Sequence, residues 1–226
     1  MKKKKDVWMP VILGVGFIAL VAGVVLLFCV WTPGTGETIT SVNNPDVPAT
    51  EAADDGVLKD YETDGYIKLA DYKTFKTTEK KEDTDDWAGT VWDDYVSKCK
   101  VEKYPDGAVE EANADLHRQY NAFAEAAGMK YTELLDSYGT TEEDIYELAK
   151  DTVKSQMAAK TIAYREGLRI DESKVDEQLM TLMGYDESDK DDDEDLMKSY
   201  IDTVGSRPKD DIYVLLASEY LVGMQE

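Results

Sequence analysis

The sequence predicts a mainly α-helical protein: an N-terminal transmembrane helix, a flexible linker, and a multi-helix domain preceded by a short extended strand. Three observations predict this order. Residues 7–31 form an apolar run without a charged side chain, and residues 32–63 are poor in large apolar side chains. In residues 104–226 apolar side chains recur at three- and four-residue steps, which places them on one face of a helix.

Residues 1–6 form a short basic tail, and residues 7–31 form the transmembrane segment. As a helix, the stretch from Trp8 to Trp31 spans about 36 Å, more than the roughly 30 Å of bilayer hydrocarbon. Four lysines precede the segment, and the positive-inside tendency keeps such an end in the cytoplasm. We therefore expect a single-pass protein of the cell membrane whose C-terminal domain is extracytoplasmic.

A cleaved signal peptide is the alternative to a retained anchor. Signal peptides have an apolar core of about 7 to 15 residues and a small-residue cleavage site, and this longer run has no such site. Lipoprotein processing at Cys29 is disfavoured because the residues before it, Leu26, Leu27 and Phe28, are bulky. The sequence therefore favours an anchor that contacts the lipid bilayer and is not removed.

The charge of the chain excludes two classes of partner for the part beyond the anchor. The 226 residues carry a net charge of −23, and residues 1–31 hold four of the 25 basic residues but only one of the 48 acidic ones. The remainder is therefore strongly acidic. Nucleic acid and anionic lipid surfaces are bound through lysine and arginine, so we expect neither as a partner.

Residues 32–63 predict a flexible linker, because Pro, Gly, Thr, Asn and Asp interrupt any regular pattern. Residues 64–103 predict a strand segment and then a short Trp-rich helix. The strand is expected within Gly65–Thr78, where β-prone side chains partly alternate. The helix is expected to begin at Trp87 and end near Lys100, with its tryptophans anchoring a core rather than binding a ligand.

Residues 104–226 predict a series of helices separated by glycines. A helix from Thr141 to Gly167 is expected at the centre, because it is the longest and carries a continuous apolar stripe. Thr140 and Thr141 are candidate caps, and Glu143 stands where a capping box needs an acid. The other helices are expected to end before Gly128, Gly139, Gly184 and Gly205, and a last helix is expected to begin at Pro208.

No catalytic, nucleotide-binding or cofactor motif occurs in the sequence, and His117 is the only histidine. The acidic stretch Asp186–Asp195 does not match a calcium loop, because Asp191 and Met197 occupy the positions that need glycine and a carboxylate. A solvated loop is favoured over weak binding of divalent ions. Cys99 stands alone outside the anchor, so no internal disulfide is expected. We expect a protein that is not an enzyme and has no cofactor or metal.

Helix caps and spacings in three groups of residues carry a family resemblance. The groups are Tyr104, Pro105, Ala108, Val109, Glu110 and Glu111; Gly128, Met129, Tyr131, Leu134, Gly139, Thr140, Glu142 and Glu143; and Val153, Lys154, Ala163, Glu166, Gly167, Ile170, Asp171, Glu172 and Val175. Together they resemble the C-terminal substrate-binding domain of trigger factor, a fold shared with the peptide-binding part of SurA. Residues 65–74 also resemble the extended segment that leads into this domain.

The same comparison shows two departures from trigger factor. Only about 25 residues separate Thr78 from Tyr104, which leaves no room for a prolyl isomerase domain. The ribosome-docking loop of the family is absent as well. The resemblance therefore implies a cradle of helices that binds unfolded or secreted polypeptides without catalysing a reaction. The acidic exterior would favour basic clients, and a scaffold holding one folded partner at the membrane is the alternative function.

Flexible or amphipathic apolar side chains are the candidates for contact with such polypeptides, because methionine adapts to irregular surfaces. For each of them, packing in the core is the competing interpretation. The candidates are Met129, Tyr131, Met157, Met180, Met183 and Tyr185.

Overall fold

The computed structural model describes residues 55–84, 86–182 and 205–225 of the chain. The predicted transmembrane segment, most of the predicted linker and the helix expected before Gly205 lie outside the described residues. Within the described residues, no helix is both long enough and apolar enough to cross a bilayer.

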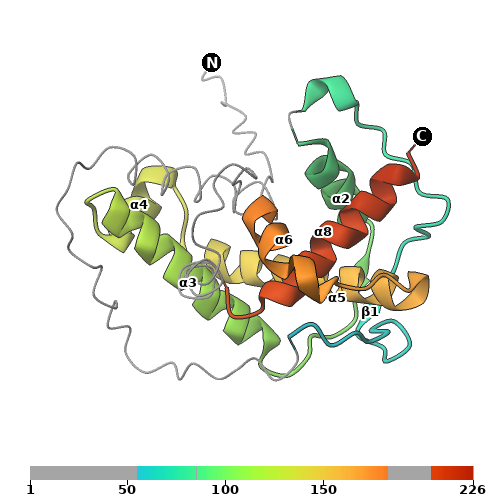
Figure 1. Ribbon diagram of the computed structural model, residues 1–226. Coiled ribbons are helices and arrows are strands. Elements are labelled where there is room, and N and C mark those ends of the chain that lie inside the picture. Colours follow the sequence, from blue (N-terminus) through green and yellow to red (C-terminus); the bar gives the residue numbers. More distant parts are fainter. Residues whose placement is uncertain (1–54, 85, 183–204, 226) are drawn as a thin grey trace, which may run out of the picture.

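The described part of the chain is mainly helical, as the sequence predicts, and its only sheet is one pair of two-residue strands. In chain order, the elements are β1 (Ile67–Lys68), η1 (Lys81–Asp83), α2 (Trp87–Ser97), β2 (Lys100–Val101), α3 (Ala108–Ala126), α4 (Tyr131–Tyr138), α5 (Glu142–Glu166), η2 (Glu172–Lys174), α6 (Val175–Leu182) and α8 (Pro208–Gly223). Figure 1 shows α5 and α8 crossing the middle of the molecule, with α2 and α6 beside α8.

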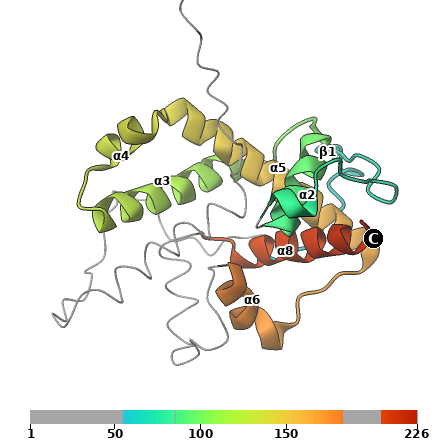
Figure 2. The ribbon, with the colours of Figure 1, turned by 90° about the horizontal axis from the view of Figure 1, so that it is seen from above.

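The helices divide into an arm and a body. Figure 2 shows α3, α4 and the first part of α5 extending to one side as the arm. The remainder of α5, together with α2, α6 and α8, forms the body (Figure 2). Because α5 belongs to both parts, it joins them as one continuous rod of 25 residues.

Local signals at both ends of α5 explain where this helix begins and ends. At the start, Thr141 Oγ1 accepts a hydrogen bond from the backbone N–H of Asp144 at 3.2 Å, and the Asp144 carboxylate accepts one from the N–H of Thr141 at 2.8 Å. This reciprocal capping box lies one residue after the expected pair of Thr140 and Glu143. At the end, Gly167 has a φ of 70°, a left-handed conformation that favours glycine.

The last helix, α8, is enclosed by other helices of the body. Ile212, Ala217 and Leu221 are completely buried, and Tyr213 and Val214 between them are nearly so. These buried residues point in several directions around the helix, because α8 packs against α2, α5 and α6 at once. A helix that is apolar on most of its circumference is typical of a buried position. The body is therefore built around α8 as much as around α5.

The strand pair corrects the expected end of the Trp-rich helix. That helix, α2, ends at Ser97, and Lys100–Val101 forms β2 rather than its last turn. Ile67 of β1 lies opposite Val101 in an antiparallel pair. Ile67 is 1% exposed, so pairing satisfies the backbone next to a buried side chain. Trp92 of α2 is also 1% exposed, which agrees with the predicted core role.

Residues 55–63 belong to the folded domain, although the sequence assigns them to the linker. The backbone N–H of Tyr61 donates to Thr161 Oγ1 of α5 at 3.1 Å, and the Tyr61 side chain is 7% exposed. The Asp55 carboxylate accepts hydrogen bonds from the backbone N–H groups of Lys209 and Asp210, at 3.0 and 3.2 Å, at the start of α8. The pKa of Asp55 is raised mainly by burial and to a smaller extent by the negative charge of Asp210.

A buried ion pair joins the two central helices at the same place. Lys160 Nζ of α5 lies 2.7 Å from Asp210 Oδ1 of α8, and both side chains are 1% exposed. The same Asp210 oxygen accepts a hydrogen bond from the Gly56 N–H at 2.9 Å. Buried charges persist only when they are paired and hydrogen-bonded. This pair therefore connects α5, α8 and the N-terminal segment of the domain.

Candidate functional site

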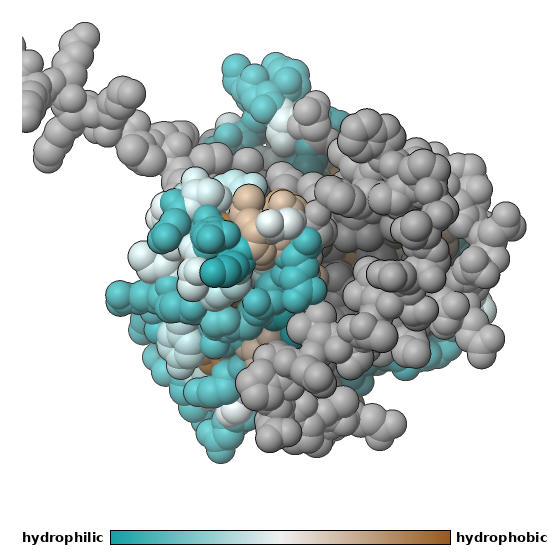
Figure 3. All heavy atoms as spheres, turned by 90° about the vertical axis from the view of Figure 1, so that its left-hand side faces the viewer, coloured by the Kyte–Doolittle hydropathy of each residue, from teal (hydrophilic) through white to brown (hydrophobic). Residues whose placement is uncertain are grey.

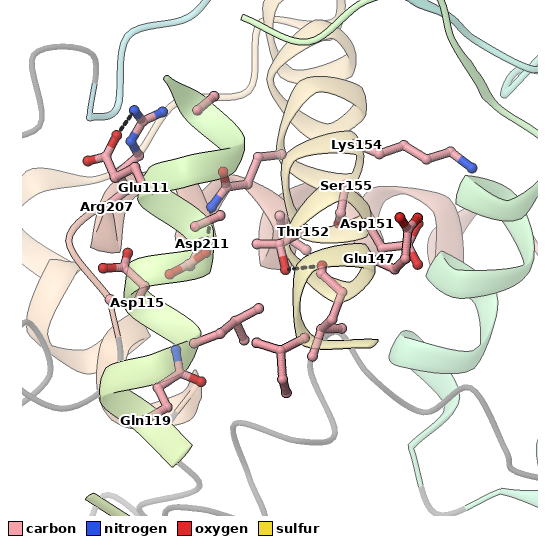
Figure 4. Close-up of a pocket in the computed structure, with 18 of the residues that line it drawn as sticks. Glu111, Asp115, Gln119, Glu147, Asp151, Thr152, Lys154, Ser155, Arg207 and Asp211 are labelled. Atoms are coloured by element: carbon pink, nitrogen blue, oxygen red, sulfur yellow. Dashed lines mark hydrogen bonds and ion pairs between the residues drawn. The ribbon is translucent and has the colours of Figure 1, made fainter. Parts of the chain in front are cut away.

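A cavity of about 570 Å³ lies where α2, α3, α5 and α8 face one another, between the arm and the body. This volume is within the range of cavities that bind ligands. Most of the wall is apolar, with Leu116 of α3, Ile145 and Leu148 of α5 and Val214 of α8 among the side chains that line it. Figure 4 shows polar side chains on α3 and α5 around the same space.

Carboxylates outnumber cations among the described residues that line the cavity. The cations are Lys154 and Arg207. The carboxylates are Asp93, Glu111, Asp115, Asp144, Glu147, Asp151 and Asp211. An apolar wall with an excess of negative charge favours a ligand that is both apolar and basic.

The carboxylates on the α3 side have partners within the protein. Glu111 forms an ion pair with Arg207, which the close-up in Figure 4 marks with a dashed line. Asp115 Oδ2 accepts hydrogen bonds from the backbone N–H and the hydroxyl of Ser206, both at 2.9 Å. Burial raises the pKa of Asp115 although these two bonds oppose the shift. This side of the cavity is therefore a connected polar network.

The carboxylates at the α2 side lack such partners. Asp93 of α2 is half-buried, and Asp151 of α5 is exposed at the rim. Among the described residues, neither side chain has a hydrogen bond or an ion pair within bonding distance. Burial raises the pKa of Asp93 to about 6, and repulsion by Asp86 and Asp151 adds to the shift. Partial burial also raises the pKa of Asp151, while the nearby Lys154 opposes the shift.

None of the predicted contact residues that the structure describes lines the cavity. Met157 is 2% exposed and Met180 is 6% exposed, so both pack in the interior, as the competing interpretation of core packing expects. Met157 occupies the apolar stripe of α5, which faces inward along its length. Met183 and Tyr185 lie outside the described residues.

Met129 and Tyr131 lie at the outer end of the arm, between α3 and the start of α4. Met129 is 36% exposed. The Tyr131 ring lies 5.4 Å from the imidazole of His117, and its hydroxyl donates to Glu142 at 3.2 Å. Contact with a polypeptide stays a prediction for these two residues. Figure 3 views this side of the molecule, where the described surface is mostly hydrophilic around a small hydrophobic area.

The residues at the cavity have no distinctive signal in the sequence. Asp93 and Asp151 are two of 48 acidic residues, and nothing in their immediate neighbours separates them from solvated surface acids. Their position depends on α2 folding back against α5, a contact between segments about 60 residues apart. A weak signal exists in Asp151, which stands three residues after the buried Leu148 on α5 and thus beside the apolar stripe.

The described residues contain no group of three or more His, Cys, Asp or Glu side chains arranged to hold a metal ion. Cys99 is 5% exposed, and burial raises the pKa of its thiol, which makes the reactive thiolate scarce. Its Sγ lies 3.7 Å from the carbonyl oxygen of Tyr95. Cys99 is therefore a buried side chain that does not line the cavity.

Comparison of the chain with family models, with curated proteins and with solved structures gave no match. The function is therefore inferred from the geometry and charge of the cavity and from the sequence.

Proposed function

We propose that this protein is a non-catalytic, chaperone-like protein that binds unfolded or secreted polypeptides outside the cytoplasm. Residues 7–31 would hold it in the lipid bilayer, and residues 55–225 would form the binding domain. The observation that carries this proposal is the apolar cavity between the arm and the body. The resemblance of the helix order to trigger factor and SurA supports it independently.

The size of the cavity favours a short extended segment over a folded partner. A cavity of 570 Å³ encloses a few side chains of one segment. Two folded proteins in a stable complex instead meet over a broad surface, with roughly 800 Å² buried on each partner. Apolar side chains of an unfolded polypeptide would leave water on entering this space, which is the usual driving force for such binding. This is why we prefer a chaperone-like role to that of a scaffold.

The surface around the cavity suits a protein that handles aggregation-prone chains. The face that carries the arm is largely hydrophilic, so a loaded molecule would remain soluble (Figure 3). The large negative charge of the chain has the same effect. Met129 and Tyr138, which are 36% and 55% exposed, offer additional apolar surface near the end of the arm.

Suppression of aggregation is the direct test. The full chain in nanodiscs should slow the aggregation of a chemically unfolded protein at micromolar concentrations, compared with empty nanodiscs. Ala112→Phe would place a ring in the cavity from α3 and should weaken the suppression several-fold. Ala127→Phe is the matched control, because Ala127 is exposed and lies outside the cavity. Absence of suppression by the unmodified chain would refute the proposal.

A further inference from the structure

The cavity has one end where negative charge is not compensated. On the α3 side, Arg207 pairs with Glu111 and Ser206 binds Asp115, so the charges there are satisfied within the protein. At the α2 side, Asp93 and Asp151 face the cavity without a hydrogen-bond partner among the described residues. The two ends of one cavity therefore differ in what they still require from a ligand.

The groups around Asp93 and Asp151 strengthen this difference. Asp86, at the start of α2, adds a negative charge that acts on Asp93. Glu147 lies one turn before Asp151 and is neutralised in part by Lys150, whose Nζ is 2.5 Å from it. Figure 4 shows Glu147 and Asp151 on the same side of α5.

Lys154 is the one cation among the described lining residues at this end of the cavity. It lies one turn after Asp151 on α5 and opposes the rise in the pKa of that carboxyl. It does not figure among the causes of the shift at Asp93, all of which raise the pKa. A half-buried carboxylate with negative neighbours and no cation is unfavourable by itself, and an incoming cation would relieve it.

Resting on the function proposed above, we propose that Asp93 and Asp151 form a subsite for one lysine or arginine side chain of the bound polypeptide. The apolar wall beside them would receive the neighbouring apolar side chains of the same segment. The long aliphatic stem of a lysine or arginine suits this arrangement, because it packs on apolar surface while its charged end reaches a carboxylate.

This subsite sets the class of client that the cavity selects. A segment with a basic residue next to apolar residues satisfies both the wall and the carboxylates. A purely apolar segment leaves the two carboxylates uncompensated, and an acidic segment is repelled. Exposed Asp151 at the rim would meet the cation first, and half-buried Asp93 would hold it deeper in the cavity.

Two matched peptides test the inference on the full chain in nanodiscs. One is an apolar peptide of about 12 residues with two lysines, and the other has glutamine in place of both lysines. Fluorescence anisotropy at low salt should show about tenfold tighter binding of the lysine peptide. The difference should shrink at high salt, because screening weakens a rim charge.

Two double variants locate the effect. Asp93→Asn with Asp151→Asn should abolish the preference for the lysine peptide, so that the double variant binds the two peptides with equal affinity. Asp136→Asn with Glu143→Gln removes two exposed carboxylates outside the cavity and should keep the preference. Asp151→Asn alone should halve the preference or more, and since this side chain is exposed the substitution leaves the core intact.

The outcomes separate this inference from the proposed function. Equal binding of the two peptides by the unmodified chain would overturn the subsite and leave the chaperone-like role standing. A preference that survives in the Asp93 and Asp151 double variant would also overturn it. If neither peptide binds the unmodified chain, both proposals fail.

Discussion

Two carboxylates in the body of this protein have opposite surroundings. Asp210 of α8 is 1% exposed and lies 2.7 Å from the ammonium group of Lys160, with the Gly56 N–H as a further donor. Asp93 of α2 is half-buried beside a cavity and has only negative neighbours among the groups that shift its pKa. The first carboxylate is partnered by the fold, and the second is not.

This difference separates a structural charge from one available to a ligand. Burial of a charge is tolerated when the protein supplies its partner, and removal of the partner is then strongly destabilising. A carboxylate that the protein leaves uncompensated destabilises the fold slightly, and a ligand can recover that free energy. Substitution of each group in turn tests this difference.

Loss of Lys160 should have the largest effect. Lys160→Met would leave the buried Asp210 carboxylate without its nearest cation, with Arg207 Nη1 remaining at 4.0 Å, and should lower the free energy of unfolding by about 3 to 5 kcal/mol. The double variant Lys160→Met with Asp210→Asn should recover part of that loss, because neither member of the buried pair then carries a charge. Denaturant unfolding of the three proteins measures both effects. A loss below about 1 kcal/mol would show that water reaches the pair.

Loss of the Glu166 carboxylate at the end of α5 should have a smaller effect than loss of Lys160. The Glu166 carboxylate accepts hydrogen bonds from Lys73 Nζ at 2.5 Å, from the Tyr72 hydroxyl at 2.6 Å and from the Tyr220 hydroxyl at 2.9 Å. These hydrogen bonds, of which that from Lys73 has the largest effect and that from Tyr72 the next largest, lower the pKa of Glu166 to about 2. Glu166→Ala should lower the free energy of unfolding at neutral pH by about 1 to 3 kcal/mol.

The pH dependence gives a second measurement of the same cluster. A carboxyl with a lowered pKa in the folded state stabilises the fold fully above its ordinary value of 4.5. That stabilisation is lost as the pH falls from 4.5 towards 2. The difference in stability between the unmodified chain and Glu166→Ala should therefore narrow in this window. An equal difference at pH 7 and pH 2.5 would contradict the role of the charge.

Asp93→Asn should stabilise the protein while weakening the binding of a basic peptide. The pKa of Asp93 is about 6 in the folded state against 3.8 for a free side chain, so its charge opposes folding above pH 6. We expect a gain of about 1 to 2 kcal/mol at pH 7, after allowance for partial exposure. The gain should shrink as the pH falls from 6 towards 3.8 and vanish below 3.8, where the carboxyl is neutral in both states.

The control for this variant is Asp136→Asn, because Asp136 is exposed and lies outside the cavity. Its stability should differ from that of the unmodified chain by less than about 0.5 kcal/mol at any pH above 4. Destabilisation by Asp93→Asn would indicate that a partner for Asp93 exists in the protein and would remove the contrast with Asp210.

Local features of the fold could be predicted from the sequence. The stops at Gly128, Gly139 and Gly167 all occur where expected, and the start at Thr141 is one of the two predicted caps. Each depends on a few neighbouring residues, since a cap or a left-handed turn is a local arrangement. The apolar spacing of α3 and α5 likewise follows from one helical face.

Features that depend on distant segments could not be predicted. Lys160 interrupts the apolar stripe of α5, and only the return of α8 brings Asp210 within 2.7 Å of it. Residues 55–63 have a linker-like composition, yet Tyr61 packs on α5 through a contact across 100 residues. The pairing of β2 with β1 depends in the same way on segments that meet only in the folded chain.

The residues of the candidate site likewise depend on contacts between distant segments, which the sequence does not show. The flexible, apolar side chain of Met157 favours a contact role, but Met157 lies on the inward face of α5 and packs in the core. In the sequence, Asp93 and Asp151 do not differ from the other acidic residues, and only the fold places them at the cavity. Composition correctly indicated an acidic protein, but it could not indicate which acids lack a partner, because partners come from other helices.

Met129 should have the smallest effect on stability and therefore gives the cleanest test of a contact at the end of the arm. It is 36% exposed, so Met129→Ser should change the free energy of unfolding by no more than about 0.5 kcal/mol. Met157→Ala, at 2% exposure, should lower it by about 2 to 5 kcal/mol and serves as the buried counterpart. If the arm contacts clients, Met129→Ser should slow their capture a few-fold at unchanged stability. If Met129→Ser captures clients as fast as the unmodified chain does, the end of the arm does not contact them, and the arm contributes only a wall of the cavity.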